Sequence, residues 1–295
     1  MVKSVVYFTK DISPQGLVRI YDALNCTLKD KVAVKISTGE PGGHNYLHPE
    51  LIEPLVSKLS GTIVECCTAY RGKRFDADNH MQAVKDHGFT AIAPCDIMDA
   101  EGEMRIPVSD GKHLGGYNIV GSHIVNYKSM LMLSHFKGHA MGGFGGALKN
   151  MSIGVASRNG KAWIHSVGRT EDPDTMWGMT DDQDGFLESM AEACQSVISF
   201  FGADNMAYIN VANRLSVDCD CVANPRESEM ADIGIFASLD PVALDQACYD
   251  AIMNSTDEGK AALVKRMLKK NAIHTVDTAY ELGLGSKQYE IINID

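Results

Sequence analysis

Two histidines and two cysteines are the side chains of this sequence best suited to binding a metal ion. His135 and His139 are four residues apart, and a single residue separates Cys219 from Cys221. In an extended segment both thiols point to the same side, where they could bind one zinc or iron ion. Nearby glycines argue against a helix at the histidine pair, so its spacing alone does not fix a chelating geometry. Polar loop histidines and two reduced thiols at a strand end are the alternatives.

A glycine-rich segment, residues 142–150, precedes a predicted helix and could bind an anion. Closely spaced glycines let backbone N–H groups converge on a phosphate or carboxylate. Neither the Walker pattern nor the G-x-G-x-x-G pattern is met, which disfavours nucleoside triphosphates and dinucleotides. A tight turn that requires positive φ is the competing interpretation. The anion-binding residues expected here are Gly143, Gly145, Gly146, Lys149 and Asn150.

A basic cluster in this acidic chain could recognise the charged group of a substrate. Arg71 and Arg74 follow Tyr70 closely, and a guanidinium offers a two-pronged donor to carboxylate or phosphate. A solvated loop is the alternative. Lys161 and His165 are candidates for proton transfer and, with Lys149, complete the predicted catalytic set.

Composition places the chain among globular proteins. Of its 295 residues, 45% are hydrophobic and 22% charged, with a formal net charge of -11. This charge disfavours nucleic acid as a partner. No apolar run approaches the roughly 18 residues of a membrane helix, and the first residues lack the apolar core of a secretory signal, so we expect a cytoplasmic protein. There the eight cysteines should be core thiols or metal ligands, not a disulfide framework.

Short β-branched runs alternate with amphipathic stretches, which predicts an α/β fold: a mostly parallel sheet with helices on both faces. Helices are expected at 186–201, at 48–59 despite Pro54, and from Pro241, with Asp240 as its cap. The predicted strands are Val5–Phe8, Val32–Ile36, Thr62–Cys66, Ala91–Ala93, Met130–Leu133, Ala207–Val211, Ile233–Ala237 and Glu290–Ile294.

The predicted site depends on the direction of these strands. In open α/β sheets, ligands bind outside the carboxyl ends of the strands. If the strands run parallel, the polar loops after Val32–Ile36, Thr62–Cys66, Met130–Leu133, Ala207–Val211 and Ile233–Ala237 share one rim. We expect a single unit over residues 1–295, with a possible boundary within 168–184 between two lobes around a cleft.

These motifs resemble, in order and over nearly the whole chain, the domain of unknown function 362 family, whose members are often labelled uncharacterised Fe–S centre proteins. The resemblance implies an α/β fold with a metal or cofactor site but no settled reaction. It rests on residues 70–74 with His80, 135–150, Gly160-Lys161 with His165, Cys219-Asp220-Cys221, 232–235, 238–243 and 283–289.

The chain departs from many members of that family at one place. They carry a ferredoxin-like insertion with two cysteine-rich runs, whereas residues 166–184 here contain no cysteine. A pair of four-cysteine Fe–S clusters is therefore excluded in this region. If the relatives use that insertion to deliver electrons, this protein needs an external electron donor or performs chemistry without net redox change.

Three functions are compatible with these residues. The favoured one is a metal-dependent enzyme that acts on a small carboxylate- or phosphate-bearing substrate, with zinc or iron as the ion. The alternatives are a non-catalytic carrier of a metal or cofactor, and a metal-free binder of a phosphate-bearing ligand. Neither the substrate nor the oligomeric state follows from the sequence.

Overall fold

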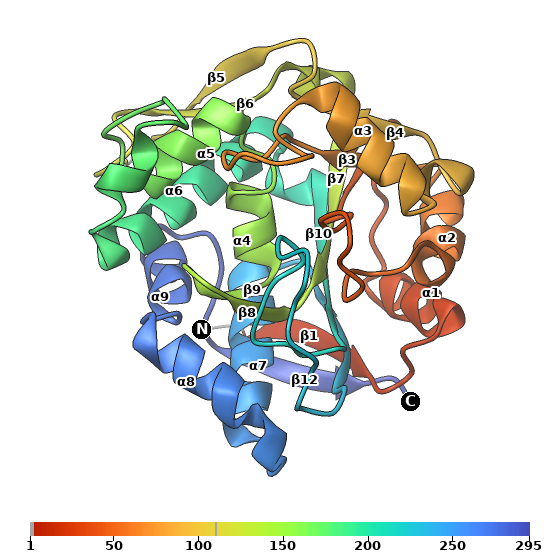
Figure 1. The fold of residues 1–295 in the computed structure, drawn as a ribbon. Coiled ribbons are helices and arrows are strands. Elements are labelled where there is room, and N and C mark those ends of the chain that lie inside the picture. The colour runs from red at the N-terminus through yellow and green to blue at the C-terminus, as the bar shows by residue number, and fades with distance from the viewer. Residues whose placement is uncertain (1–2, 110) are drawn as a thin grey trace.

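The computed structural model describes residues 3–109 and 111–295, and an eight-stranded sheet runs through their centre (Figure 1). In spatial order its strands are β12 (Tyr289–Asn293), β1 (Ser4–Thr9), β11 (Gly234–Ser238), β10 (Met206–Ala212), β7 (Ser129–His135), β2 (Val32–Lys35), β3 (Thr62–Glu65) and β4 (Cys95–Ile97). β11 runs antiparallel to both neighbours, and the other pairings are parallel. The predicted α/β fold with a mostly parallel sheet is confirmed.

Helices and two small hairpins surround this sheet. The helices are α1 (Pro14–Ala23), α2 (Pro49–Lys58), α3 (Ala77–Asp86), α4 (Ala147–Ser152), α5 (Arg158–His165), α6 (Gln183–Phe201), α7 (Pro241–Asn254), α8 (Ala261–Lys269) and α9 (His274–Glu281). β5 (Glu103–Pro107) pairs with β6 (Tyr117–Gly121), and β8 (Lys137–His139) pairs with β9 (Gly143–Gly145). No helix of the described residues is long and apolar enough to cross a membrane.

The alternation of side chains along the strands produces two apolar cores, one on each face of the sheet. In β7, Met130 and Met132 join the core that includes residues of α4, α6 and α7. Leu131 and Leu133 join the opposite core, with residues of α1 and α2. Because successive residues of a strand point to opposite faces, a fully apolar strand needs helices on both sides. That arrangement is the predicted one.

Local signals place several helices correctly. Asp240 accepts hydrogen bonds from the N–H groups of Val242 and Ala243, so it caps α7 as predicted. α6 contains the predicted apolar face, and Asp182 caps it. α2 continues through Pro54 because burial of apolar residues on its inner face offsets the hydrogen bond that proline removes.

One predicted strand is wrong. Ala91–Ala93 lies at a short 3-10 turn, Phe89–Ala91, and the strand of this region is β4, a few residues later. Gly88, with a φ of 87°, ends the preceding helix in the left-handed conformation. The chain then turns once more before Cys95 pairs with Ile63 of β3.

Four of the five loops predicted to share one rim of the sheet do so. The loops after β2, β3, β7 and β10 all contribute residues to one cavity. The loop after β11 lies at the opposite edge, because β11 runs antiparallel to β10, with Asn210 opposite Phe236. Hydrophobicity identifies a buried strand but does not give its direction.

A buried carboxylate joins β10, α4 and α7. Asp245 of α7 accepts hydrogen bonds from the backbone N–H groups of Ala147 and Leu148 and from the side-chain amide of Asn210. Burial raises the pKa of Asp245 to about 6, although these donors act in the other direction. The first turn of α4, which carries Lys149, is therefore held by a side chain nearly a hundred residues away.

We expect Asp245→Ala to lower the free energy of unfolding by about 3 kcal/mol, because it leaves three buried donors without their acceptor. Urea unfolding followed by circular dichroism measures the change. Asp204→Ala, at an exposed position, should change stability by less than about 0.5 kcal/mol. Equal effects of the two substitutions would contradict this role of Asp245.

Candidate active site

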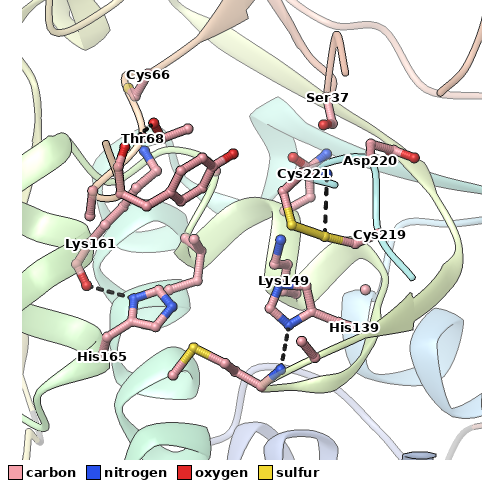
Figure 2. Close-up of a pocket in the computed structure, with 18 of the residues that line it drawn as sticks. Ser37, Cys66, Thr68, His139, Lys149, Lys161, His165, Cys219, Asp220 and Cys221 are labelled. Atoms are coloured by element: carbon pink, nitrogen blue, oxygen red, sulfur yellow. Dashed lines mark hydrogen bonds between the residues drawn. A yellow bond between two sulfur atoms is a disulfide. The ribbon is translucent and has the colours of Figure 1, made fainter. Parts of the chain in front are cut away.

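A cavity of about 360 Å³ lies at the carboxyl ends of β2, β3 and β7 (Figure 2). α4, α5 and the segment that contains the two cysteines complete its wall. Residues 168–184, for which a boundary between lobes was one of two interpretations, contribute Met176 and Trp177 to the wall. The ionisable side chains that line the cavity include Lys35, Glu65, Arg74, Lys137, His139, Lys149, Lys161, His165 and Asp220.

Two of these cations have carboxylate partners beside β3. Lys35 Nζ lies 3.2 Å from Glu65 Oε2, and Arg74 Nε donates to Glu40 Oε2 at 2.9 Å. Tyr70 donates to the same Glu40 oxygen and accepts from Arg74. Burial by itself would raise the pKa of Glu65, but the charge of Lys35 and neighbouring groups holds it well below its usual range. Tyr70 and Arg74 line the cavity as predicted, but the charge of Arg74 is already matched.

A third carboxylate, Asp220, joins the cysteine segment to the end of β7. Its two oxygens lie 2.7 Å from Lys137 Nζ and 2.8 Å from His135 Nδ1. Burial opposes ionisation, yet Lys137 and His135 keep the pKa of Asp220 well below its usual value. His135 Nε2 also faces the carbonyl oxygen of Asn213, at 2.7 Å. Both ring nitrogens of His135 therefore have protein partners, so this predicted metal ligand instead binds the cysteine segment.

Lys149 and Lys161 have no carboxylate partner among the described residues. Lys161 Nζ donates to the carbonyl oxygen of Ala156 at 2.6 Å, and no described group forms a hydrogen bond with Lys149 Nζ. Removal from bulk water and the charge of Lys137 lower the pKa of Lys149 to about 7. The cavity therefore holds positive charge that the protein does not neutralise, which favours an anionic ligand.

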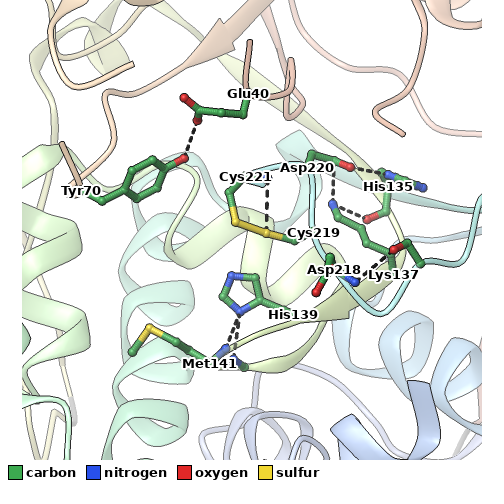
Figure 3. Close-up of a disulfide and its surroundings, with 12 residues drawn as sticks. Glu40, Tyr70, His135, Lys137, His139, Met141, Asp218, Cys219, Asp220 and Cys221 are labelled. Atoms are coloured by element: carbon green, nitrogen blue, oxygen red, sulfur yellow. Dashed lines mark hydrogen bonds and ion pairs between the residues drawn. A yellow bond between two sulfur atoms is a disulfide. The ribbon is translucent and has the colours of Figure 1, made fainter. Parts of the chain in front are cut away.

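Two neutral histidines complete this cationic wall. Burial lowers the pKa of His165 to about 4, and its Nδ1 donates to the carbonyl oxygen of Lys161 at 2.7 Å, so Nε2 is left as an acceptor. Burial and the charge of Lys149 hold the pKa of His139 well below its usual range. His139 Nδ1 accepts from the N–H groups of Met141 and Gly142 (Figure 3). Its proton is therefore on Nε2, as a donor.

His139, Cys219 and Cys221 form a group that could hold a metal ion. One potential ligand atom from each lies within 4.8 Å of the others. The sequence predicted two reduced thiols, whereas the structure joins the cysteines as a disulfide (Figure 3). Their Cα atoms are 5.2 Å apart and the Asp220 side chain points away, which places both sulfur atoms on one side. The same placement permits a disulfide or a pair of metal-binding thiolates.

The glycine-rich segment does not form the predicted anion cradle. Its N–H groups at the start of α4 donate to Asp245, so the protein's own carboxylate takes the place of a ligand. Gly145 and Gly146 do line the cavity, whereas Gly143, with a φ of 79°, lies in β9 against Ala272. Asn150, also in the wall, donates to the carbonyl oxygen of Lys35 and to Ser134.

Arg71 lies outside the cavity wall that the described residues form. Its guanidinium pairs with Asp174 through bonds of 2.6 to 3.1 Å, and both side chains are more than half exposed. Because this pair is solvated and its charge is matched, Arg71 is not placed to bind a ligand in the cavity.

Sequence reasoning did not assign a role to Lys137, Glu65 or Asp220. Glu65 is the last residue of the buried strand β3, and Lys137 follows the end of the buried strand β7 after one residue. Asp220 lies between the two cysteines. A buried charge needs a partner, so charged residues at such positions were the available signal. The identity of each partner depends on contacts between distant segments.

The arrangement defines an α/β protein with a cationic cavity at the carboxyl ends of its parallel strands, the usual place for a ligand in this class of fold. The chain belongs to the DUF362 family, described as a domain of unknown function, whose model matches residues 32–250. No curated protein matches significantly.

Two solved structures match much of this chain at low sequence identity. The lactate racemase apoprotein from Thermoanaerobacterium thermosaccharolyticum has a TM-score of 0.46 and 15% identity over 85% of this chain. A protein from Thermotoga maritima has a TM-score of 0.46 and 11% identity over 80% of this chain. In each case the match covers 57% of the other protein's length.

We expect Lys149→Met to stabilise the protein by roughly 1 to 2 kcal/mol at pH 6, because it removes a charge that burial disfavours. The pKa of Lys149 in the folded protein, about 7, lies below its ordinary value of 10.5. The folded chain thus binds this proton less well than the unfolded chain, and the gain should shrink as the pH rises from 7 towards 10.5.

Urea unfolding at pH 6 and pH 9 tests the sign. Lys128→Met, at an exposed position, should show no such gain at either pH. A gain for Lys149→Met that is independent of pH would mean that the buried charge is not its cause.

Proposed function

We propose that this protein is an enzyme that acts on a small anionic substrate, a carboxylate or a phosphate, bound in the cavity. The observation that carries the proposal is the unneutralised positive charge of Lys149 and Lys161 in a chain whose net charge is -11. Burying such charge has a cost in stability that a bound anion would offset.

The surrounding groups suggest a role for each side chain. Lys149 binds the anion directly, since its ammonium group has no described partner. His139 donates from Nε2, and His165 accepts a hydrogen bond from the substrate at Nε2. The low pKa of His165 makes it a weak base, so Lys149, with a pKa of about 7, is the better group to hold or move a proton at neutral pH.

A second form of this proposal is a metal-dependent enzyme. The closeness of His139, Cys219 and Cys221 favours it, because nitrogen and sulfur donors suit zinc or iron. Zinc would supply Lewis-acid chemistry, and iron would add redox chemistry that needs an external electron donor. The residues fit only after two changes: the disulfide must be reduced, and the proton of His139 must move from Nε2 to Nδ1, which then no longer accepts from the N–H groups of Met141 and Gly142. A carrier of the metal would use the same ligands.

Anion binding is the first test, with inorganic sulfate as the probe because its charge is constant near neutral pH. We expect Lys149→Met and Lys161→Met each to weaken sulfate binding by about tenfold in calorimetry, since a charge-assisted hydrogen bond is lost. Affinity in the wild-type protein should fall from pH 6 to pH 8, as Lys149 loses its proton.

Lys128→Met is the matched control, because it removes one positive charge from an exposed position outside the cavity. It should leave sulfate affinity within about twofold of the wild-type value. If all three variants bind sulfate equally, the anion does not occupy this cavity, and the proposed function is wrong.

Metal content is the second test. Protein purified under reducing conditions, without a metal-binding tag, should retain zinc or iron in plasma mass spectrometry. His139→Ala should lower the retained metal by about tenfold or more, since it removes the nitrogen ligand. His44→Ala, an exposed histidine, should not change it. Wild-type protein that retains no metal and binds none on addition would rule out the metal-dependent form and leave the anion-binding form standing.

A further inference from the structure

The disulfide between Cys219 and Cys221 has an unusual position for a structural crosslink. It joins residues separated by one position, so it closes a very short loop. A disulfide stabilises a fold chiefly by restricting the unfolded chain, and this effect grows with loop length. The bond also lies in the wall of the cavity, beside His139 (Figures 2 and 3). The short loop and the position in the cavity wall favour a chemical role for this disulfide over a stabilising one.

Other interactions hold the cysteine segment in place. The carboxylate of Asp220, between the two cysteines, binds Lys137 and His135, and its carbonyl oxygen accepts from the N–H of Glu40. Earlier in the same segment, the carbonyl oxygen of Ser216 accepts a hydrogen bond from the N–H of Gly138. None of these contacts uses a cysteine sulfur. Breaking the disulfide therefore leaves both sulfur atoms side by side and next to His139.

A closely packed backbone adds to this support. A Cβ atom at Gly138 would collide with the backbone of Val217, so β8 and the cysteine segment lie in direct contact. The carbonyl oxygen of Val217 also accepts a hydrogen bond from Arg266 of α8. The segment is thus tied to β7, β8, α8 and the loop after β2, and reduction is not expected to unfold it.

The six remaining cysteines are free thiols, and one of them provides a contrast. Cys66 lines the same cavity, but its Sγ donates to the carbonyl oxygen of Val155. Burial raises the pKa of Cys66 well above the ordinary value, which disfavours the reactive thiolate. Cys221, by comparison, is partly exposed, so a small reductant that enters the cavity can reach the disulfide.

We propose that Cys219 and Cys221 form a redox gate on this site: their disulfide excludes a metal ion, and their two thiols admit zinc or a similar ion beside His139. The proposal rests on the metal-dependent form of the proposed function. It assigns these two cysteines as the residues that must change oxidation state before an ion can bind.

The reductant is a dithiol. One of its thiolates attacks a sulfur of the pair and forms a mixed disulfide, and its second thiol then displaces the protein sulfur. Two electrons and two protons pass to the protein, which gains two thiols, while the reductant becomes a cyclic disulfide. Binding of the ion afterwards releases the thiol protons to solvent.

The test compares wild-type protein in two states, treated with dithiothreitol or with oxidised glutathione and then freed of reagent without air. Maleimide labelling after denaturation, read by mass spectrometry, should count eight thiols in the reduced state and six in the oxidised state. Equilibrium dialysis against zinc, read by plasma mass spectrometry, should show at least about tenfold more bound zinc in the reduced state.

Two variants assign this difference to the pair. Cys219→Ser cannot form the disulfide, so its zinc binding, weakened by the lost ligand, should be the same in both states. Cys66→Ala, the matched control in the same cavity, should keep the full difference between the states. Loss of the difference in Cys66→Ala alone would assign the redox response to another thiol and overturn the gate.

The outcomes separate the gate from the proposals on which it rests. Equal zinc binding in both states of the wild-type protein, or eight free thiols after oxidation, overturns the gate and leaves the metal site intact. Zinc binding in neither state overturns the gate together with the metal-dependent form. The sulfate experiment is independent of both, because it depends on Lys149 and Lys161 and not on the cysteines.

Discussion

The site depends on the contacts that the carboxylate of Asp220 makes with two side chains at the end of β7. This carboxylate lies between Lys137 and His135 and brings a loop that follows β10 back over the carboxyl ends of the strands. One ion-paired side chain therefore closes the cavity, places two sulfur atoms in its wall and occupies one nitrogen of His135. A buried carboxylate tolerates such a position only with charged partners, so the three side chains act as a unit.

The other buried carboxylates in and around the cavity also have partners within the protein. Glu65 and Glu40 partner Lys35 and Arg74, and Asp245 occupies the N–H groups at the start of α4. After these pairings, the groups left to meet a ligand are few: the ammonium groups of Lys149 and Lys161, the two neutral histidine rings and the cysteine pair. Most of the charged side chains around the cavity are thus paired within the protein, and Lys149 and Lys161 have no such carboxylate partner among the described residues.

The corrections to the sequence-based expectations share one cause. The glycine-rich segment has the composition of an anion cradle, but Asp245, from a helix far along the chain, already fills that role. His135 has the chemistry of a metal ligand, but Asn213 and Asp220 take both of its nitrogens. A motif shows what a segment can bind, and its neighbours in space decide whether those groups are still available.

The sequence by itself determined the class of fold and pointed to many of the residues that line the cavity. Apolar periodicity and capping residues act over a few positions, so seven of the eight strands of the sheet, the helices α2 and α6, and the start of α7 at Pro241 could be predicted. His139 and Cys219 were expected in polar loops after buried strands, and both line the cavity, because such loops meet at one edge of a parallel sheet. Lys149, expected in the glycine-rich segment, lines it too. Only the tertiary structure decided the direction of β11, the partners of each charged group and the pairing of the cysteines. Those features depend on contacts between residues that are distant in sequence. A local sequence pattern contains no information about the free energies of such contacts.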